Sequence, residues 1–578
     1  MPLVLNPRNR EPAKKESFIG RPAFFYVFLG ILGLIFFSKL FYLQIIKGEY
    51  YRSQAASEHQ KKFEIPAKRG GIYANDGERK VPLVLNETKK TIFADPRYVK
   101  DKDGTAKIIS EVIGGETETY KKLLESNSAY VVLLKNVPKS KGEELAERQL
   151  KGIGQTDTPS RVYPQGNLGA QIIGFVNGEE KGQYGVEEFF NESLHGKTGQ
   201  LKAVTDVNGV PLAAGENSVL VSPKDGEDIH LTIDINVQRK IEELLKETTE
   251  KSKAKSTSAI VIETKTGRIR AMGNYPTFDP SKFTEVTDYS VFSNRISSEP
   301  YEPGSVMKVF TMSSALDEGA VNPSSTFQDR GSVKVDDRTI KKSRDWGNGT
   351  KPKVQILQYS LNTGVVFLLE QLGGGQINQQ AREKLHHYFV DKFRFSQLTG
   401  LEISGESKGL ISEVTTGAGD NVRYANMTFG QGMNLTMIQV ASALNSIING
   451  GIYYRPTIIQ KSDQPDVVDK EVIKQQTSSD IKNMMKQTID ASPFKKPGYY
   501  IGGKSGTSQL LDSSGNYSED KTTGSYIGFV GSSDAEYSIM VRVDEPKTQG
   551  FSGTTVAGPL FQEVFNYLID YYGIAPGA

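Results

Sequence analysis

The stretch YEPGSVMKVFTMSSALDEG, residues 301–319, predicts a short helix that is buried on nearly every side. Pro303 and Gly304 precede the helix and Gly319 ends it. Its apolar residues occupy most of the helix surface, so the helix belongs inside a large domain rather than on its surface. Ser305 opens the helix, and Lys308 follows one turn later on the same face.

Ser305 and Lys308 form a candidate pair of nucleophile and base. Burial disfavours the ammonium form of a lysine, which lets the amine take a proton near neutral pH. The helix N-terminus also directs N–H groups toward a developing oxyanion. A core helix without chemistry is the alternative, and we favour the catalytic interpretation. The S-x-x-K spacing alone is weak support, because it occurs at Ser252, Ser305, Ser479, Ser492 and Ser518. Only Ser305 opens a strongly apolar helix.

Two further motifs follow in order. Ser360-Leu361-Asn362 lies 55 residues after Ser305, where a second apolar helix is expected to begin. The segment Lys504-Ser505-Gly506-Thr507 lies another 144 residues on, within YYIGGKSGTSQLL, which is typical of a strand with room for close backbone approach. K-[ST]-G alone is common in this chain, but the ordered triple on suitable elements is a strong signal of serine acyl transfer.

Other catalytic patterns are weaker. The G-x-S-x-G match at residues 405–409 lies in a polar, turn-like context and lacks the buried strand that a nucleophile elbow needs. His386 and His387 are adjacent in a charged helical stretch, so they point to different faces and make a poor metal pair. No metal or cofactor is expected.

Composition narrows the class of protein further. The chain has 578 residues, enough for two to four folded units. Its 70 basic and 68 acidic residues give a net charge of +2, which does not suit nucleic-acid binding. The absence of cysteine excludes disulfides and thiolate chemistry.

A membrane anchor is expected near the N-terminus. No residue from Pro22 to Ser38 is charged, and the apolar character continues to Ile46, which exceeds the ~20 residues that cross a bilayer as a helix. No small-x-small cleavage site follows, which argues against a cleaved signal peptide. Basic residues lie on both sides of the span, so the positive-inside bias is weak. A short inner tail and a large outer part are the simpler arrangement.

Several elements beyond the anchor can be predicted. The segment from Ile229 predicts a strand and then an amphipathic helix, and residues 256–274 predict two strands joined at Thr266-Gly267. SYIGFVGS and YSIMVRVDEP predict consecutive strands, and a closing helix is expected from Pro559. Residues 223–228 are typical of a linker. The sheet of the C-terminal domain should therefore combine segments that are distant in sequence.

At this point the chain resembles the class B penicillin-binding proteins. Besides the three motifs, the resemblance rests on residues 69–77 (RGGIYANDG), 163–196, 231–238 (LTIDINVQ) and 429–451 (FGQGMN and onward), and it covers nearly all of the chain after the anchor. Ala74 and Asn75 stand where the family usually has Asp-Arg. Leu361 replaces the commoner serine of S-S-N, which should matter little.

The resemblance implies a multidomain α+β and α/β fold. A cytoplasmic tail (1–21) and a transmembrane helix (22–46) would precede an elongated α+β pedestal domain (47–229). A C-terminal transpeptidase domain (230–574), a sheet flanked by helices, would follow. The protein would lie in the inner (cytoplasmic) membrane of a bacterium as a single-pass protein, with the catalytic domain on the extracytoplasmic side.

The resemblance also implies roles for residues of the nucleophile and S-x-N motifs. Ser305 would attack the penultimate carbonyl of a D-Ala-D-Ala stem peptide, Lys308 would take the serine proton, and Ser360 would relay a proton to the leaving amine. Asn362 would bind the substrate amide.

The K-S-G-T motif would complete the substrate site. Lys504 would supply positive potential, and Ser505 and Thr507 would bind the terminal carboxylate beside Gly506. The N–H groups of Ser305 and Thr507 would form the oxyanion hole. An amine of a neighbouring stem peptide would then take the acyl group and make a cross-link.

Partners and alternatives follow from the same resemblance. Expected partners are lipid-linked nascent glycan, β-lactams, a glycosyltransferase of the shape, elongation, division and sporulation family, and other division or elongation membrane proteins. A D,D-carboxypeptidase or β-lactamase-like hydrolase and a β-lactam sensor remain alternatives. Glycosyltransferase activity is not expected, because Asn191 and Leu194 occupy positions that need Phe and His. The motifs favour a division-type enzyme over an elongation-type one, and so a septal role.

Overall fold

The computed structural model describes residues 20–51, 60–65, 67–204, 219–461, 464–511, 517–547 and 553–577. The chain forms two compact units. One contains Met1–Ala67 and Lys197–Lys224, and the other contains Lys68–Gly196 and Asp225–Ala578. The expected cytoplasmic tail, residues 1–21, lies almost wholly outside the described residues.

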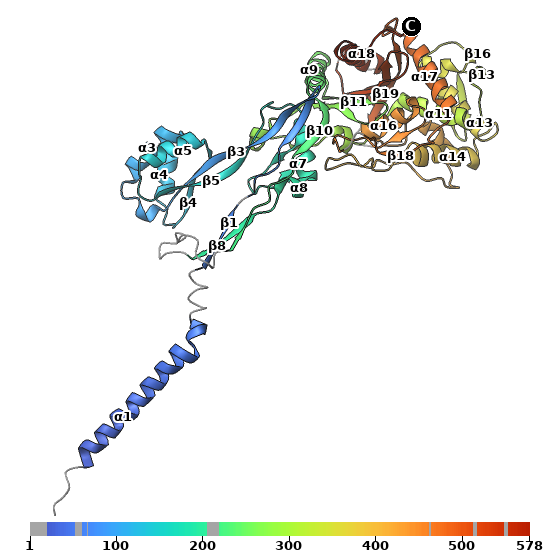
Figure 1. Cartoon of the computed structure of the whole chain (residues 1–578). Coiled ribbons are helices and arrows are strands. Elements are labelled where there is room, and N and C mark those ends of the chain that lie inside the picture. Colours follow the sequence, from blue (N-terminus) through green and yellow to red (C-terminus); the bar gives the residue numbers. More distant parts are fainter. Residues whose placement is uncertain are drawn as a thin grey trace, which may run out of the picture. The chain divides into compact units, whose positions relative to one another are not determined.

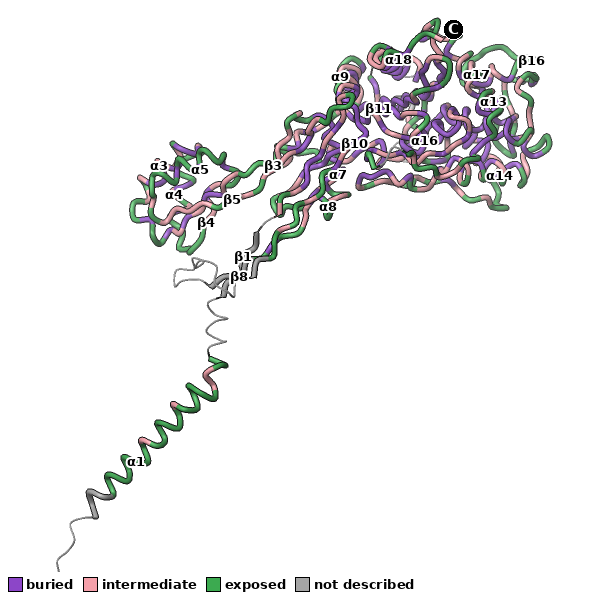
Figure 2. Tube along the Cα trace, in the orientation of Figure 1, coloured by how far each residue is buried: buried purple, intermediate pink, exposed green. Residues whose placement is uncertain are grey.

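The first unit contains the apolar helix. Helix α1 spans Gly20–Phe41 and continues as a π-helical turn, Tyr42–Ile46. Phe24–Ile46 is the one helical stretch in the described residues that is long and apolar enough to cross a membrane, and none of it is buried. Figure 2 shows the helix exposed along nearly its whole length. A helix that is apolar on all faces and is not buried by protein can be buried in a lipid bilayer.

A small antiparallel sheet completes the first unit. It has the order β1-β8-β9, and its strands are β1 (Gln60–Ile65), β8 (Gly199–Val204) and β9 (Val219–Val221).

In the second unit, the pedestal is built on a long twisted sheet. Strand β3 (Arg79–Ala94) pairs through its first half with β2 (Ile72–Asp76) and through its second half with both β4 (Val131–Val137) and β5 (Ile153–Val162). Strand β10 (Ile229–Asp234) adds to β2 in parallel. Because β3 belongs to both halves, it ties them into one scaffold.

Three helices cover the outer half of this sheet (Figure 1), namely α3 (Lys102–Ile113), α4 (Thr117–Leu124) and α5 (Lys139–Glu147). Ile92 and Ala94 of β3 pack with Ile109 and Leu124 in a core of their own. Near β10 lie short elements, which are α6 (Ala170–Ile173), β6 (Phe175–Val176), β7 (Gly182–Gln183), α7 (Gly185–Phe189) and α8 (Asn191–His195).

The two departures from the family pattern have defined places in the pedestal. Ala74 is buried in the core of β2, and the Asn75 side chain donates to the Leu231 carbonyl at 2.7 Å. Asn75 thereby joins β2 to β10 without a charge. The segment expected to be a linker is also ordered at its end, because Asp225 accepts from the Lys68 N–H and Asp228 accepts from the Gly71 N–H.

The C-terminal domain contains a five-stranded antiparallel sheet of order β12-β11-β21-β20-β19. Its strands are β11 (Ser256–Glu263), β12 (Ile269–Tyr275), β19 (Tyr500–Leu511), β20 (Tyr517–Gly531) and β21 (Tyr537–Asp544). The first two strands are adjacent in sequence and the last three follow more than 220 residues later, so the prediction of a sheet from distant segments is confirmed.

Helices cover both faces of this sheet. On β11, Val261 faces the core beneath α9 (Ile235–Ser252) and α18 (Gly553–Tyr572), whereas its neighbours Ile260 and Ile262 face the larger core. This larger core contains α11 (Lys308–Asp317) and α16 (Met437–Ile448). The alternation follows from the two-residue period of a strand, and Figure 2 shows β11 as largely buried.

The domain also contains helices and short strands outside the central sheet. The helices are α10 (Arg295–Ser298), α12 (Val354–Gln358), α13 (Asn362–Leu372), α14 (Gln379–His386), α15 (Asp420–Met427) and α17 (Gln475–Asp490). Of these, α12, α13, α14 and α17 contact α11. The short strands are β13 (Thr326–Asp329), β14 (Ser332–Val335), β15 (Arg338–Lys341), β16 (Gly349–Pro352), β17 (Tyr453–Tyr454) and β18 (Val467–Asp469).

The start of the last helix differs from the prediction. Helix α18 begins at Gly553, not at Pro559, and contains that proline. Val556 and Ala557 lie in the core under the sheet, and their burial stabilises a turn of helix upstream of the proline. The preference of proline for the start of a helix therefore led to a predicted start that lies too late in the sequence.

Candidate active site

Ser305 lies on a 3₁₀ turn, Gly304–Met307, that leads directly into α11. Every residue of α11 is buried, as the apolar pattern predicted. Gly304 has φ +65°, and a Cβ at this position would lie 2.6 Å from the Thr507 carbonyl oxygen. Only glycine lets this loop press against β19 in that conformation. The loop and the strand therefore bring Ser305 next to the K-S-G-T motif.

Lys308 is fully buried and connects two of the predicted motifs. Its Nζ donates to the Ser360 carbonyl at 2.5 Å and to Asn362 Oδ1 at 2.7 Å, and Ser360 Oγ lies 3.1 Å from the same nitrogen. A neutral amine has two N–H groups and one lone pair, and the two shortest bonds use both N–H groups. The amine can thus keep a lone pair for a proton while its position stays fixed.

The segment that presents Ser360 has an unusual backbone. Ser360 adopts φ +53°, a left-handed conformation that costs a non-glycine residue of the order of 1 kcal/mol. In this conformation both its carbonyl and its hydroxyl reach Lys308 Nζ. Asn362 begins α13, and its Nδ2 donates to the Lys341 carbonyl at 3.3 Å, which orients Oδ1 toward the amine.

The electrostatics favour a neutral Lys308. Burial holds the pKa of Lys308 well below its ordinary value, and the positive charge of Lys504 lowers it further. Lys504 is itself buried on β19, donates to the Ser505 carbonyl at 2.8 Å and has its pKa lowered by burial to about 7. Two buried amines close to each other cannot both hold a proton without cost, so they titrate as a coupled pair.

Strand β19 is the edge strand of the sheet, and it forms one wall of the site. The side chains of Ser505, Thr507 and Gln509 line a cavity, as the two-residue period of a strand requires. Gly506 lies between them, where a Cβ would be 2.4 Å from Ser525 Oγ and 2.9 Å from the Pro303 carbonyl oxygen. Thr507 Oγ1 accepts from the Gly553 N–H at 2.8 Å, which leaves its hydroxyl proton available for a ligand.

The cavity has a volume of about 440 Å³ and combines all three motifs. Ser305, Ser360 and Asn362 line it together with the β19 side chains, while Lys308 and Lys504 are buried beneath. The site residues predicted from sequence therefore lie together. The other lining residues are Ser343, Arg344, Trp346, Gln358, Tyr359, Phe429, Gln431 and Thr554.

Several of these walls were not identified from the sequence. Trp346 stacks on Tyr359, with ring centroids 4.7 Å apart and an interplanar angle of 15°, and Lys351 Nζ lies 5.8 Å from the Tyr359 ring centroid. Gln431 follows Gly430, whose carbonyl accepts from the Gly304 N–H at 3.1 Å. Trp346 is the only tryptophan of the chain, which could have drawn attention to it.

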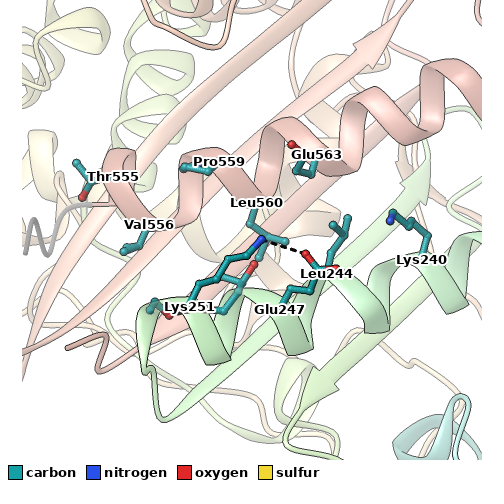
Figure 3. A pocket seen from close by; sticks show the side chains of 11 residues that line it. Lys240, Leu244, Glu247, Lys251, Thr555, Val556, Pro559, Leu560 and Glu563 are labelled. Atoms are coloured by element: carbon teal, nitrogen blue, oxygen red, sulfur yellow. Dashed lines mark hydrogen bonds and ion pairs between the residues drawn. The ribbon is translucent and has the colours of Figure 1, made fainter. Parts of the chain in front are cut away.

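A second cavity of about 460 Å³ lies between α9 and α18, on the opposite face of the sheet from α11. Figure 3 shows its apolar floor of Leu244, Val556 and Leu560, and an ion pair between Lys251 and Glu247 at 3.1 Å. Ser252 also lines this cavity. Its hydroxyl donates to the Thr248 carbonyl, and Lys255 pairs with Glu545, so this S-x-x-K match is structural.

The remaining sequence candidates also have structural roles. Residues 405–409 form a loop without helix or strand, as predicted. His387 bonds to Asp391 at 2.7 Å, and His386 lies 3.3 Å from Glu413, so the two rings point to different partners. Leu361 is buried, away from the cavity. Within the described residues, no cluster of His, Asp and Glu is arranged to hold a metal.

Comparison with known proteins identifies the family. Residues 257–566 match the penicillin binding protein transpeptidase domain, and residues 64–231 match the penicillin-binding protein dimerisation domain. The chain is similar to Stage V sporulation protein D of Bacillus subtilis (30% identity, covering 96% of this chain and 86% of that protein). It is also similar to the probable peptidoglycan D,D-transpeptidase PenA of Neisseria meningitidis (25% identity, 99% and 96% covered).

A solved structure agrees with these sequence matches. Penicillin Binding Protein 2X from Streptococcus thermophilus superposes with a TM-score of 0.70 at 26% identity, over 89% of this chain and 80% of that chain. A fold of pedestal and transpeptidase domain, with an apolar N-terminal helix suited to anchoring in a membrane, is therefore shared with this group. The chain belongs to the class B penicillin-binding proteins and is a membrane-anchored peptidoglycan D,D-transpeptidase.

Proposed function

We propose that this enzyme cross-links stem peptides through an acyl-enzyme on Ser305. The observation that carries the proposal is the environment of Lys308, a buried amine with a lowered pKa whose N–H groups are bound by Ser360 and Asn362. Such an amine is a base at neutral pH. In the first step, Lys308 takes the Ser305 proton while Oγ attacks the penultimate D-Ala carbonyl carbon.

The remaining steps reuse the same groups. The N–H groups of Ser305 and Thr507 stabilise the oxyanion of the tetrahedral intermediate. The carbon–nitrogen bond then breaks, and a proton from Lys308 passes through Ser360 to the departing D-Ala amine. The amine of a second stem peptide then attacks the ester carbonyl carbon, and its proton passes through Ser360 and Lys308 to Ser305 Oγ as the ester carbon–oxygen bond breaks. The products are the new amide cross-link and free Ser305.

Strand β19 supports the proposed mode of substrate binding. An edge strand presents unpaired backbone groups, and an extended peptide can add to it as a further strand. Ser505 and the Thr507 hydroxyl face the cavity, beside the charge of Lys504, where they would bind the terminal carboxylate. β-Lactams carry a carboxylate and a reactive amide at comparable positions, so we propose that they acylate Ser305.

In the cell, we propose that α1 holds the catalytic domain on the extracytoplasmic side, where peptidoglycan is assembled. The motifs around Ser305 and Ser360 support a septal role, with a glycosyltransferase of the shape, elongation, division and sporulation family as partner. An elongation role is the alternative. A sporulation role is a second candidate, because the relative at 30% identity is named a sporulation protein.

Mass spectrometry of the full-length protein after treatment with a penicillin tests the proposal. The expected result is one adduct, on the peptide that contains Ser305, and its absence in Ser305→Ala. An adduct on another peptide would refute the assignment. Fast loss of the adduct by hydrolysis would favour a carboxypeptidase or β-lactamase-like enzyme. Intact wall synthesis in Ser305→Ala cells that lose a transcriptional response would favour a sensor.

Localisation of a fluorescent fusion separates the cellular roles. Enrichment at the septum supports the division role, and uniform labelling of the sidewall supports elongation. Expression confined to sporulating cells would instead favour the sporulation role.

A further inference from the structure

Two arginines and two carboxylates form a charge cluster beside the nucleophile loop, which we define as residues 301–305. The cluster contains Arg295 and Glu299 of the α10 region and Arg542 and Asp544 of β21. The side chains of Arg542 and Asp544 are only 3% and 4% exposed. The formal charges cancel, so the cluster forms a neutral polar network that runs from the buried pair of Arg542 and Asp544 to the partly exposed Glu299.

Arg542 uses its whole guanidinium in this network. Nε donates to Asp544 Oδ1 at 2.8 Å, Nη2 donates to Glu299 Oε1 at 3.1 Å and Nη1 donates to the Glu299 carbonyl at 3.4 Å. Its flat face lies over the Tyr301 ring, 4.1 Å from the centroid. A planar fork can bind two partners along its edge and an aromatic ring on its face, which a lysine cannot do.

Asp544 fixes this arginine to the sheet. Besides Arg542, it accepts from Thr523 Oγ1 on β20 at 2.8 Å and from Ser256 Oγ on β11 at 2.9 Å. Arg295 Nη2 approaches the same carboxylate at 3.3 Å. Three neighbouring strands therefore hold the position of the Arg542 guanidinium.

Tyr301 connects Arg542 to the nucleophile loop. Its backbone exchanges two hydrogen bonds with Leu435, both 2.9 Å, and the Gly304 N–H donates to the Gly430 carbonyl three residues later. Tyr301 is thus held between the guanidinium and the segment from residue 430 to 435. Ser305 lies only four residues beyond it, so a shift of the Tyr301 ring would displace the serine.

Stability alone does not explain a network of this kind. Removing charges from water costs so much that buried ion pairs often contribute less to stability than well-packed apolar side chains. The network also does not set the protonation of Lys308, whose lowered pKa results from burial and from Lys504. The role left for the network is to hold the side chains it contacts in a fixed geometry.

We infer that Arg542 is a positioning residue, which holds Tyr301 and through it the attack geometry of Ser305. The inference rests on the proposed function, in which Ser305 is the nucleophile. It predicts a loss in the rate of the acylation step rather than in the binding that precedes it, because the cavity walls do not include Arg542.

Stopped-flow acylation of the full-length protein by a fluorescent penicillin separates the two quantities. For Arg542→Lys, we expect the first-order acylation rate constant to fall roughly tenfold or more, while the dissociation constant of the preceding complex changes by less than about twofold. Tyr301→Phe keeps the ring and should retain the wild-type rate constant, whereas Tyr301→Leu should lose it. The acid limb of the pH profile should not move.

Arg270→Lys is the matched control, since Arg270 lies on the same sheet and pairs with Glu263 at 2.8 Å without contact to the loop. Tyr301→Leu leaves the pair between Arg542 and Asp544 intact and serves as the test if Arg542→Lys does not fold. An unchanged rate constant in folded Arg542→Lys or in folded Tyr301→Leu, or an equal loss in Arg270→Lys, would overturn the inference. Absence of a Ser305 adduct in the wild-type protein would instead overturn the proposed function.

Discussion

The hydrogen bond between Lys308 and Asn362 should set the pH at which acylation begins. At 2.7 Å, Asn362 Oδ1 accepts from Lys308 Nζ whether the amine is charged or neutral. A hydrogen bond from a charged donor contributes about 1.5–3 kcal/mol and a neutral one about 0.5–1.5 kcal/mol. Asn362→Ala therefore removes about 1–1.5 kcal/mol of preference for the ammonium, which is about one pKa unit.

The sign of the shift follows directly. Losing the acceptor lowers the pKa of Lys308 further, so the amine is neutral at a lower pH. The acid limb of the acylation rate should move down by about one pH unit in Asn362→Ala. Asn362→Asp places a negative charge beside the amine, raises its pKa and should move the limb up. Opposite shifts from the two substitutions cannot result from general damage to the site.

The assay is the second-order rate constant for acylation of the full-length protein by a fluorescent penicillin, measured across the pH range in which the protein stays folded. Asn449→Ala is a control, because Asn449 also bonds through both ends of its amide, to the Ile452 backbone and the Thr264 carbonyl, but does not contact Lys308. An unmoved limb in Asn362→Ala, or shifts of the same sign in both substitutions, would refute the reasoning.

Three further predictions follow from the structure. Gly304→Ala should destabilise the fold by about 1–2 kcal/mol and slow acylation. The reason is that φ at this position is +65° and the new Cβ would lie 2.6 Å from the Thr507 carbonyl oxygen. Calorimetry measures the loss of stability, and the acylation assay measures the loss of rate. Burial lowers the pKa of Lys504 to about 7, so Lys504 should lose its proton and its charge as the pH rises through 7. The acylation rate should therefore decrease above about pH 7, and a rate that is flat from pH 6 to pH 9 would contradict this. Burial raises the pKa of Glu242 to about 7, so the contribution of this residue to stability should be greatest below the unfolded pKa of 4.5 and should be lost as pH rises through 7. Relative to the wild-type protein, Glu242→Gln should remove roughly 3 kcal/mol of pH dependence between these values in denaturant titrations, and an unchanged pH dependence would contradict this.

Much of the fold was predictable because its patterns are local. The helix after Ser305 is apolar on all faces, so its burial, and with it the burial of Lys308, follows from sequence. Ile260, Val261 and Ile262 are all apolar although they face two different cores of the domain. A continuous apolar run of this kind predicts a strand that is covered on both faces.

Other parts of the site depend on contacts that sequence spacing does not contain. Trp346 and Gln431 reach the cavity from loops, and Arg542 meets Tyr301 across more than 240 residues. The left-handed backbone of Ser360 could not be expected from a serine, since such conformations are favoured by glycine and asparagine. The start of α18 was missed because tertiary packing of Val556 outweighed the propensity of Pro559 to begin a helix.

If β-lactams acylate Ser305 as proposed, the position of β19 at the edge of its sheet also limits how this enzyme could escape inhibition. A strand edge recognises amide groups through its own backbone, where only a substitution to proline removes an N–H and no substitution removes a carbonyl. A variant therefore cannot reject a β-lactam by deleting those hydrogen bonds while keeping them for the stem peptide. Discrimination has to come from movement of β19 relative to Ser305, or from the side chains at residues 505, 507 and 509 that face the cavity. Gly304 and Gly506, where loop and strand touch, are the positions at which such movement would begin.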